Sequence, residues 1–194
     1  IRSLFSYFRK SHQEKKGQSL FKICKWWQPD IIIEFGCSDG RTSAYLSAGR
    51  PSASLFTIGS EKGKLQEASA LWKKLGLTNI VPVYGSDQKS WSLLSKQDKK
   101  RTLVYIGGNQ HANQVLLRLQ EISIQIPKPY LVILDTMSGS KSLEADWCSF
   151  ALDKGGAWLD LYNNYLWIAD KAFLQPLSLT LISRKFKPFR LGWI

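Results

Sequence analysis

A run of small and polar residues near the start of the chain could bind a ligand. Residues 31–35 read Ile-Ile-Ile-Glu-Phe and are followed by Gly-Cys-Ser-Asp-Gly and a segment typical of a helix. Gly36 and Gly40 would let the backbone approach a ligand closely, and the start of the helix would direct N–H groups at an anionic group. Glu34 is costly to bury in an apolar strand unless it is paired. The alternative is a strand-to-helix turn with a purely structural role.

His111 and Asp135, which lie later in the chain, could each accept a proton. His111 follows a predicted strand, and an imidazole with a pKa of about 6.5 can take a proton from a hydroxyl group. Asp135 ends the next predicted strand and is the second candidate base. Each also has a structural interpretation, because His111 could cap the following helix and Asp135 could accept hydrogen bonds from nearby backbone N–H groups. The sequence alone leaves both interpretations open.

The order of apolar and amphipathic segments predicts the elements that position these residues. From residue 31 onward, short β-branched or apolar runs alternate with segments of helical periodicity, which is typical of a parallel sheet covered by helices. The predicted strands are 31–35, 54–58, 80–84, 102–106 and 130–134, and the predicted helices are 41–48, 63–75, 89–97, 113–126 and 142–152. Residues 157–161 and 165–169 flank an Asn-Asn turn and predict a hairpin. We expect an α/β, Rossmann-like, doubly wound and mostly parallel seven-stranded sheet with a C-terminal antiparallel hairpin.

The sequence also suggests how the chain is organised. Residues 1–27 read as a basic amphipathic helical segment, whereas residues 28–194 hold the alternating strands and helices. From about residue 171 onward, apolar sequence with Trp and Phe indicates a C-terminal extension with further strand material. The expected organisation is one domain preceded by a helical segment.

The residues at the ends of the predicted strands form a recognisable set. The sequence Glu-Phe-Gly-Cys-Ser-Asp-Gly-Arg-Thr-Ser-Ala-Tyr-Leu at 34–46 resembles motif I of class I S-adenosylmethionine-dependent methyltransferases, in their small O-methyltransferase-like branch. The segments 57–61, 73–87, 103–111 and 131–136 are similar to later strands of that family, so the resemblance covers roughly residues 18–170. It implies S-adenosylmethionine as cofactor and O-methyl transfer to a small-molecule or sugar hydroxyl. The cofactor-binding residues that it implies are Glu34, Gly36, Ser38, Gly40, Glu61, Ser86 and Asp87.

The chain departs from the family at three acidic positions. The family's acids fall at Gly59, Ser86 and Gly107 of this chain, with Glu61 and Asp87 close by. Each missing carboxylate removes a hydrogen bond worth about 1 to 3 kcal/mol, so two or three losses would weaken cofactor binding by about two orders of magnitude or more. The alternative is therefore a catalytically inactive protein of this fold that acts as a binding or assembly module. A nicotinamide-dependent dehydrogenase fits less well, because the glycine turn lacks the G-x-G-x-x-G spacing.

No metal site is predicted. Divalent-cation-dependent members of the family use a fourth-strand aspartate and an Asp-Asn pair after the fifth strand, where this chain has Gly107, Asp135 and Thr136. A hard cation needs several oxygen ligands, and these positions offer one carboxylate. The three cysteines form no CxxC pair and the chain has only two histidines, so a zinc site is not expected either.

Composition indicates the kind of partner and compartment. The chain has 27 Lys+Arg against 15 Asp+Glu, a net charge of +12, which raises the expectation of nucleic acid or another polyanion as partner, although a solvated basic surface is the simpler interpretation. No apolar stretch reaches the ~20 residues of a spanning helix. An odd number of cysteines without a secretory leader favours a reducing compartment. We therefore expect a cytoplasmic protein; its acceptor and its oligomeric state, a homo-oligomer included, do not follow from the sequence.

Overall fold

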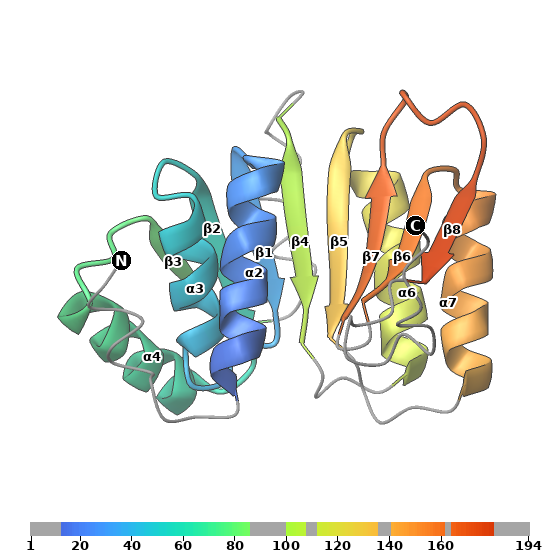
Figure 1. Ribbon diagram of the computed structural model, residues 1–194. Helices are drawn as coiled ribbons and strands as arrows, with labels where there is room; N and C mark the ends of the chain where they lie inside the picture. The colour runs from blue at the N-terminus through green and yellow to red at the C-terminus, as the bar shows by residue number, and fades with distance from the viewer. Residues whose placement is uncertain (1–12, 86–99, 108–111, 136–140, 162–163, 181–194) are drawn as a thin grey trace, which may run out of the picture.

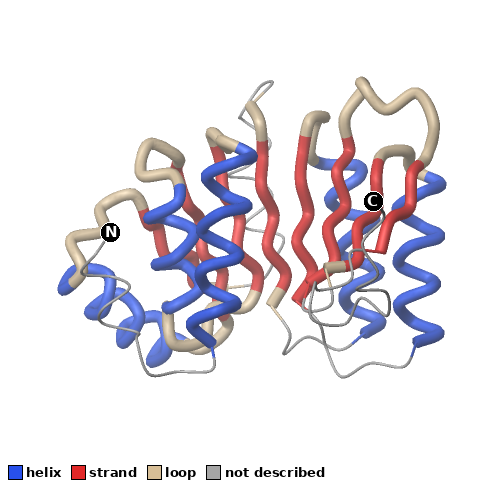
Figure 2. The backbone as a smooth tube through the Cα atoms, in the orientation of Figure 1, coloured by secondary structure: helices blue, strands red, loops and turns tan. Residues whose placement is uncertain are grey.

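The computed structural model describes residues 13–85, 100–107, 112–135, 141–161 and 164–180 of the 194-residue chain. Within these ranges a sheet runs through the middle of the molecule with helices packed on both of its faces (Figures 1 and 2). The strands are β1 (Ile31–Phe35), β2 (Ser54–Gly59), β3 (Ile80–Tyr84), β4 (Thr102–Ile106), β5 (Tyr130–Asp135), β6 (Ala157–Asp160), β7 (Asn164–Ala169) and β8 (Leu177–Thr180). The helices are α2 (Gln13–Trp27), α3 (Arg41–Gly49), α4 (Lys62–Lys74), α6 (Ala112–Gln125) and α7 (Lys141–Asp153).

The strands lie in the order β3-β2-β1-β4-β5-β7-β6-β8. Strands β1 to β5 are parallel, and β7 runs antiparallel between β5 and β6. This arrangement confirms the predicted α/β, Rossmann-like and mostly parallel sheet with its antiparallel hairpin. The predicted helices match α3, α4, α6 and α7 to within one residue at each end, while the predicted helix 89–97 and Asn163 of the predicted turn lie outside the described residues.

The predicted number of seven strands is wrong by one, because the described residues form an eight-stranded sheet. The additional strand is β8, which pairs in parallel with β6 at the edge of the sheet. All four of its residues are exposed. The sequence predicts strand material in this C-terminal extension, but the four-residue run Leu-Ser-Leu-Thr is too short to assign it to the sheet.

The central strands form because their residues are buried on both faces, whereas the edge strands β3 and β8 are largely exposed. Every residue of β1 and β4 is buried, as expected for the continuous apolar runs of a parallel sheet. Alternate residues of β1 point to opposite faces: Ile32 packs in a cluster with helices α2 and α3, whereas Ile31, Ile33 and Phe35 pack in a cluster with α6 and α7. Each face of the sheet thus has its own apolar core.

Helix α2 packs tightly against α3 through two glycines. A Cβ on Gly17 would lie 2.1 Å from Cε2 of the Tyr45 ring, and a Cβ on Gly49 would lie 2.8 Å from Cβ of Cys24. A glycine inside a helix costs about 1 kcal/mol relative to alanine, and here it permits the close approach of two helices. Helix α2 also contributes Leu20, Cys24 and Trp27 to the core. The N-terminal helix is therefore built into the sheet's covering layer, and the division at residue 27 stays a prediction.

A search of the described residues for a helix long and apolar enough to cross a membrane finds none.

Candidate functional site

A cavity of about 700 Å³ opens at the carboxyl ends of the central strands. The chain passes outward from β1 to β2 and β3 and then returns to β4, which pairs with the other side of β1. Open α/β sheets bind ligands where the strand order reverses in this way. The cavity is lined by the turn at residues 34–42 and by residues of α2, α4, α6, β4 and β5. Its position and size are those of a small-molecule site.

The glycine turn after β1 has the backbone geometry that its sequence predicts. Gly36 and Gly40 have φ angles of +93° and +76°, which favour glycine. The N–H groups of Gly36 and Cys37 both donate to the Ile58 carbonyl at 3.1 Å. Among the described residues, no acceptor is found for the backbone N–H groups of Ser38 and Gly40. The turn thus presents N–H donors beside the N-terminus of α3, where a partial positive charge favours an anionic or electron-rich group.

Gly40 also has a packing role that its sequence motif does not show. Its carbonyl accepts a hydrogen bond of 2.8 Å from the Trp72 indole of α4. A Cβ at this position would lie 2.7 Å from Cβ of Ala68 and 2.8 Å from Nε1 of Trp72. The glycine therefore seats the turn against α4 and fixes the wall of the cavity.

We predict that Gly40→Ala lowers the free energy of unfolding by about 2 to 3 kcal/mol, because it adds a steric clash to the backbone strain of a positive φ. Urea denaturation measures this change. The control is Gly76→Ala, since Gly76 also has a positive φ of +68° but has open space around it; it should cost only the strain, about 1 kcal/mol. Equal losses in the two variants would show that the contact with α4 contributes nothing.

Glu34 is buried in the middle of this region and its partners are hydroxyl groups of the protein. Its side chain is 2% exposed and accepts hydrogen bonds from Ser43 Oγ of α3 and, at 2.7 Å, from Thr57 Oγ1 of β2. Burial raises the pKa of the Glu34 carboxyl to about 7, while the two hydroxyls lower it and the charge of Asp39 raises it further. The polar partners expected for a buried Glu34 are thus side chains of the protein itself. Through them Glu34 links β1 to β2 and α3 beneath the turn.

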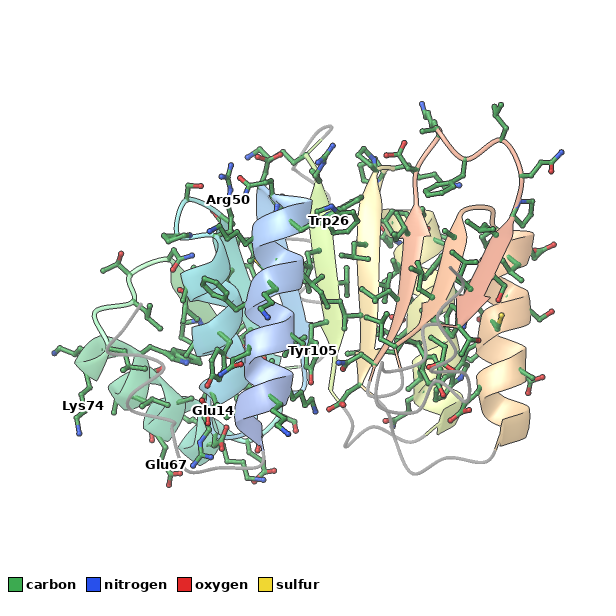
Figure 3. All side chains as sticks on the ribbon, viewed as in Figure 1. Glu14, Trp26, Arg50, Glu67, Lys74 and Tyr105 are labelled. Atoms are coloured by element: carbon green, nitrogen blue, oxygen red, sulfur yellow. The ribbon has the colours of Figure 1, made fainter. Side chains whose placement is uncertain are left out.

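The Asp135 carboxylate lies in the cavity wall, where its partners include side chains of β4 and α2. The Tyr105 hydroxyl donates to Asp135 Oδ2 at 3.1 Å, and the Lys16 ammonium pairs with the same oxygen. Burial and the nearby Asp135 carboxylate raise the Tyr105 pKa well above its ordinary value, so that hydroxyl remains a donor. Figure 3 shows Tyr105 beside helix α2, on the face of the sheet that this helix covers. Sequence reasoning missed both Lys16 and Tyr105; the glycine that follows Lys16 inside a helix was the available signal.

The remaining predicted site residues are partly within the described residues and partly outside them. Ser38 is exposed on the turn and lines the cavity. Glu61 follows β2 and also lines the cavity; its side chain is 62% exposed and accepts a hydrogen bond of 2.6 Å from Lys64. The structure thus brings Glu34, Gly36, Ser38, Gly40, Glu61 and Asp135 around one cavity. Ser86, Asp87 and His111 lie outside the described residues.

Gly107 occupies the position where an aspartate was expected at the end of β4. A Cβ there would lie 3.3 Å from the Phe35 carbonyl and 3.4 Å from the Gly36 carbonyl. Its N–H donates to the Phe35 carbonyl at 3.0 Å. An aspartate at this position would place its Cβ close to two carbonyl oxygens. Glycine therefore allows β4 to lie close to the turn.

Comparison with known proteins finds similarity in fold. The structure resembles a putative O-methyltransferase from Klebsiella pneumoniae with a TM-score of 0.63 and 14% identity, covering 79% of this chain and 80% of that protein. It resembles an O-methyltransferase from Bacillus cereus, solved in complex with SAH, with a TM-score of 0.60 and 10% identity over 78% and 79% of the two chains. No protein-family model matches the sequence, and no curated protein matches it.

A third similar structure is the O-methyltransferase TomG from Streptomyces achromogenes, solved in complex with SAM. The TM-score is 0.56 at 16% identity, and the match covers 68% of this chain. It spans 61% of that protein, which is less than two thirds of its length. The resemblance that the strand-end motifs indicated is thus confirmed at the level of the fold: the chain folds as these O-methyltransferases do.

Proposed function

We propose that the chain binds S-adenosylmethionine in the cavity at the glycine turn and methylates a hydroxyl oxygen of a small molecule. The observation that supports this most is the turn itself, which lies at the strand-order reversal, carries two positive-φ glycines and opens onto a cavity of about 700 Å³. The fold that the chain shares with O-methyltransferases adds support.

The residues around the cavity offer hydrogen-bonding groups that suit this cofactor. S-adenosylmethionine supplies a methyl group on a positively charged sulfur. The carboxylates of Asp39, Glu61 and Asp135 line the cavity, where each is paired with a cation of the same wall, namely Arg41, Lys64 and Lys16. The backbone N–H groups of Ser38 and Gly40 would hold the methionine end of the molecule. Glu61 is exposed to the cavity and can accept the two hydrogen bonds of a ribose diol.

A hydroxyl acceptor also requires a group that takes its proton. Asp135 lies in the cavity wall as a carboxylate with an ammonium and a phenol as neighbours. Carboxylates act as general bases when they lie within hydrogen-bonding distance of the proton that is removed. We therefore propose Asp135 for this role, with His111 as the other candidate. No metal is part of the proposal.

Calorimetric titration of the purified chain with S-adenosylmethionine and S-adenosylhomocysteine tests the proposal. We predict saturable binding with dissociation constants in the micromolar range, about −8 kcal/mol at 1 μM. Absence of heat and of any thermal stabilisation up to millimolar ligand would contradict it. That result would instead favour the inactive binding or assembly module, which the replacement of acids at Gly59 and Gly107 makes the second candidate.

Two further expectations concern the acceptor and the compartment. We propose a small-molecule acceptor; a nucleic-acid acceptor would show binding that falls steeply as salt rises, because its phosphates release counterions. The three cysteines are unpaired, which suits the reducing cytoplasm proposed for the protein.

A further inference from the structure

The edge of the sheet opposite the cavity carries the amino ends of the parallel strands. The first residues of β1, β2, β4 and β5 lie side by side in register, and the first residue of β5 pairs with the last residue of β7. The connections before these strands and after β7 therefore meet at one end of the molecule, together with the C-terminal ends of α2 and α6 (Figure 1). We call this end the amino edge; its residues are 25–30, 50–53, 100–101, 124–129, 153–156 and 170–174.

Three exposed apolar side chains lie at the amino edge. Trp26 is 64% exposed, Ile124 79% and Leu174 95%, which are the highest values among the large hydrophobic residues that the structure describes. They belong to three separate segments, namely the last turn of α2, the last turn of α6 and the loop between β7 and β8. Exposure of a large apolar side chain to water is unfavourable. Apolar groups that gather at one end of a protein therefore indicate a surface that binds an apolar partner.

Basic side chains surround these apolar groups. The described basic residues of the amino edge are Lys25, Arg50, Lys100, Arg101, Lys128, Lys154 and Lys171. The described acidic residues there are Asp30, Asp153 and Asp170, so this edge is positively charged. In the cavity wall at the other end of the strands, by contrast, cations and carboxylates pair with one another.

Hydrogen bonds and ring contacts hold part of this charge in place. Arg101 donates to the Trp27 carbonyl at 3.1 Å, and its guanidinium lies 4.9 Å from the centre of the Trp27 ring. The rings of Trp27 and Trp26 are 5.8 Å apart between centres. On the next strand, Arg50 donates to the side chain of Gln28, which has a positive φ of +52°. Figure 3 shows Arg50 and Trp26 at the same edge of the molecule, so the exposed indole lies among fixed cations.

The apolar residues decide which partner fits this edge. Helix C-termini attract cations, which accounts for part of the charge but not for Trp26, Ile124 and Leu174. A nucleic acid would satisfy the cations and could stack a base on Trp26, yet it offers no apolar environment to an isoleucine or a leucine. An anionic lipid surface suits both kinds of residue, because its headgroups attract Lys and Arg and its interfacial region accepts Trp and aliphatic side chains.

We infer that the amino edge docks on the surface of an anionic phospholipid bilayer. Trp26, Ile124 and Leu174 enter the headgroup region, and the surrounding lysines and arginines bind the lipid phosphates. Attachment of this kind needs no spanning helix. The cavity lies at the opposite ends of the strands and faces the water in this orientation. The inference goes beyond the proposed function and does not depend on it.

Co-sedimentation of the full chain with lipid vesicles tests the inference. The vesicles contain either phosphatidylcholine alone or equal parts of phosphatidylcholine and phosphatidylglycerol. The wild type should bind the anionic vesicles at least about tenfold more tightly, since each basic residue near such a surface contributes about fivefold. Brominated phosphatidylcholine in the anionic vesicles reports insertion, because it should quench the tryptophan emission of the wild type more than that of Trp26→Phe.

Two pairs of variants locate the docking surface. Lys25→Glu should weaken binding to anionic vesicles about tenfold or more. Its control is Lys15→Glu, which makes the same charge change at an exposed position of the same helix near the cavity end, and which should weaken binding by no more than about twofold because salt screens distant charges. Leu174→Ser should weaken binding about fivefold or more. Its control is Tyr84→Ser, an exposed position at the carboxyl end of β3, which should leave binding unchanged.

Four outcomes would overturn the inference. Equal weakening by Lys25→Glu and Lys15→Glu would show that net charge alone causes the binding. Binding that survives Leu174→Ser, or that brings no quenching by brominated lipid, would show adsorption without insertion. Failure of the wild type to bind anionic vesicles would exclude a lipid surface. If single-stranded polyuridylate then bound and Lys25→Glu weakened it, the amino edge would be a nucleic-acid surface instead.

Discussion

Gly36→Val should weaken S-adenosylhomocysteine binding by at least about 100-fold, which is roughly 2.7 kcal/mol of binding free energy. Gly36 is exposed at the mouth of the cavity and has a φ of +93°. A β-branched side chain there would stand between the ligand and the backbone, and it would push the residue toward a negative φ. Both effects move the N–H groups of the turn away from the ligand. Calorimetric titration measures the loss.

The matched control for this variant is Gly76→Val. Gly76 has a positive φ of +68°, has nothing within 4 Å of its Cβ position and follows the far end of α4. It should lower stability by about 1 to 3 kcal/mol through backbone strain and leave ligand binding intact. If Gly36→Val binds S-adenosylhomocysteine as well as Gly76→Val does, the ligand does not lie at the turn.

Glu34 should make the chain less stable as pH rises from about 5 to about 8. The pKa of Glu34 in the folded protein is about 7, above its ordinary value of 4.5, because burial disfavours the charged form. Between these two pH values the folded state holds a proton that the unfolded state has released, so the folded state binds more protons and stability falls with rising pH. The stabilisation is fully present below pH 4.5 and is lost through pH 7, with a magnitude on the order of 3 kcal/mol.

Glu34→Gln isolates this contribution. The amide oxygen can still accept hydrogen bonds from Ser43 and Thr57 but has no proton to lose. Urea denaturation at pH 5, 6, 7 and 8 should show a decline in the wild type that the variant lacks, and the difference between the two proteins removes the contribution of other groups. Parallel stability curves would mean that Glu34 is ionised throughout this range in the folded protein.

The connection between Glu34 and the site is structural. Its carboxyl joins β1, β2 and α3 directly beneath the turn that carries Gly36 and Gly40. Loss of the proton at higher pH places a negative charge in a buried position, where the hydroxyls of Ser43 and Thr57 must stabilise it. We expect stability and ligand binding to weaken together over the same pH range.

The amino-acid pattern was enough to predict the layered fold and the glycine turn that lines the cavity. The apolar runs of β1, β4 and β5 are buried on both faces, which requires a parallel sheet with helices on each side. The glycine spacing after β1 predicted the turn, since Gly36 and Gly40 need a conformation that other residues avoid. These features are local in the chain, so residue types and spacing are enough to reveal them.

Which side chains meet at the cavity depends on how distant segments pack together. Lys16 and Asp135 are 119 residues apart in sequence, and their pairing depends on the packing of α2 on α3 through Gly17 and Tyr45. The internal partners of Glu34 and the contact of Gly40 with α4 likewise join separate elements. Strand β8 lies in the predicted C-terminal extension, and only its pairing with β6 makes it part of the sheet. Contacts between distant segments are set by packing, and the pattern of residues along the chain does not predict them.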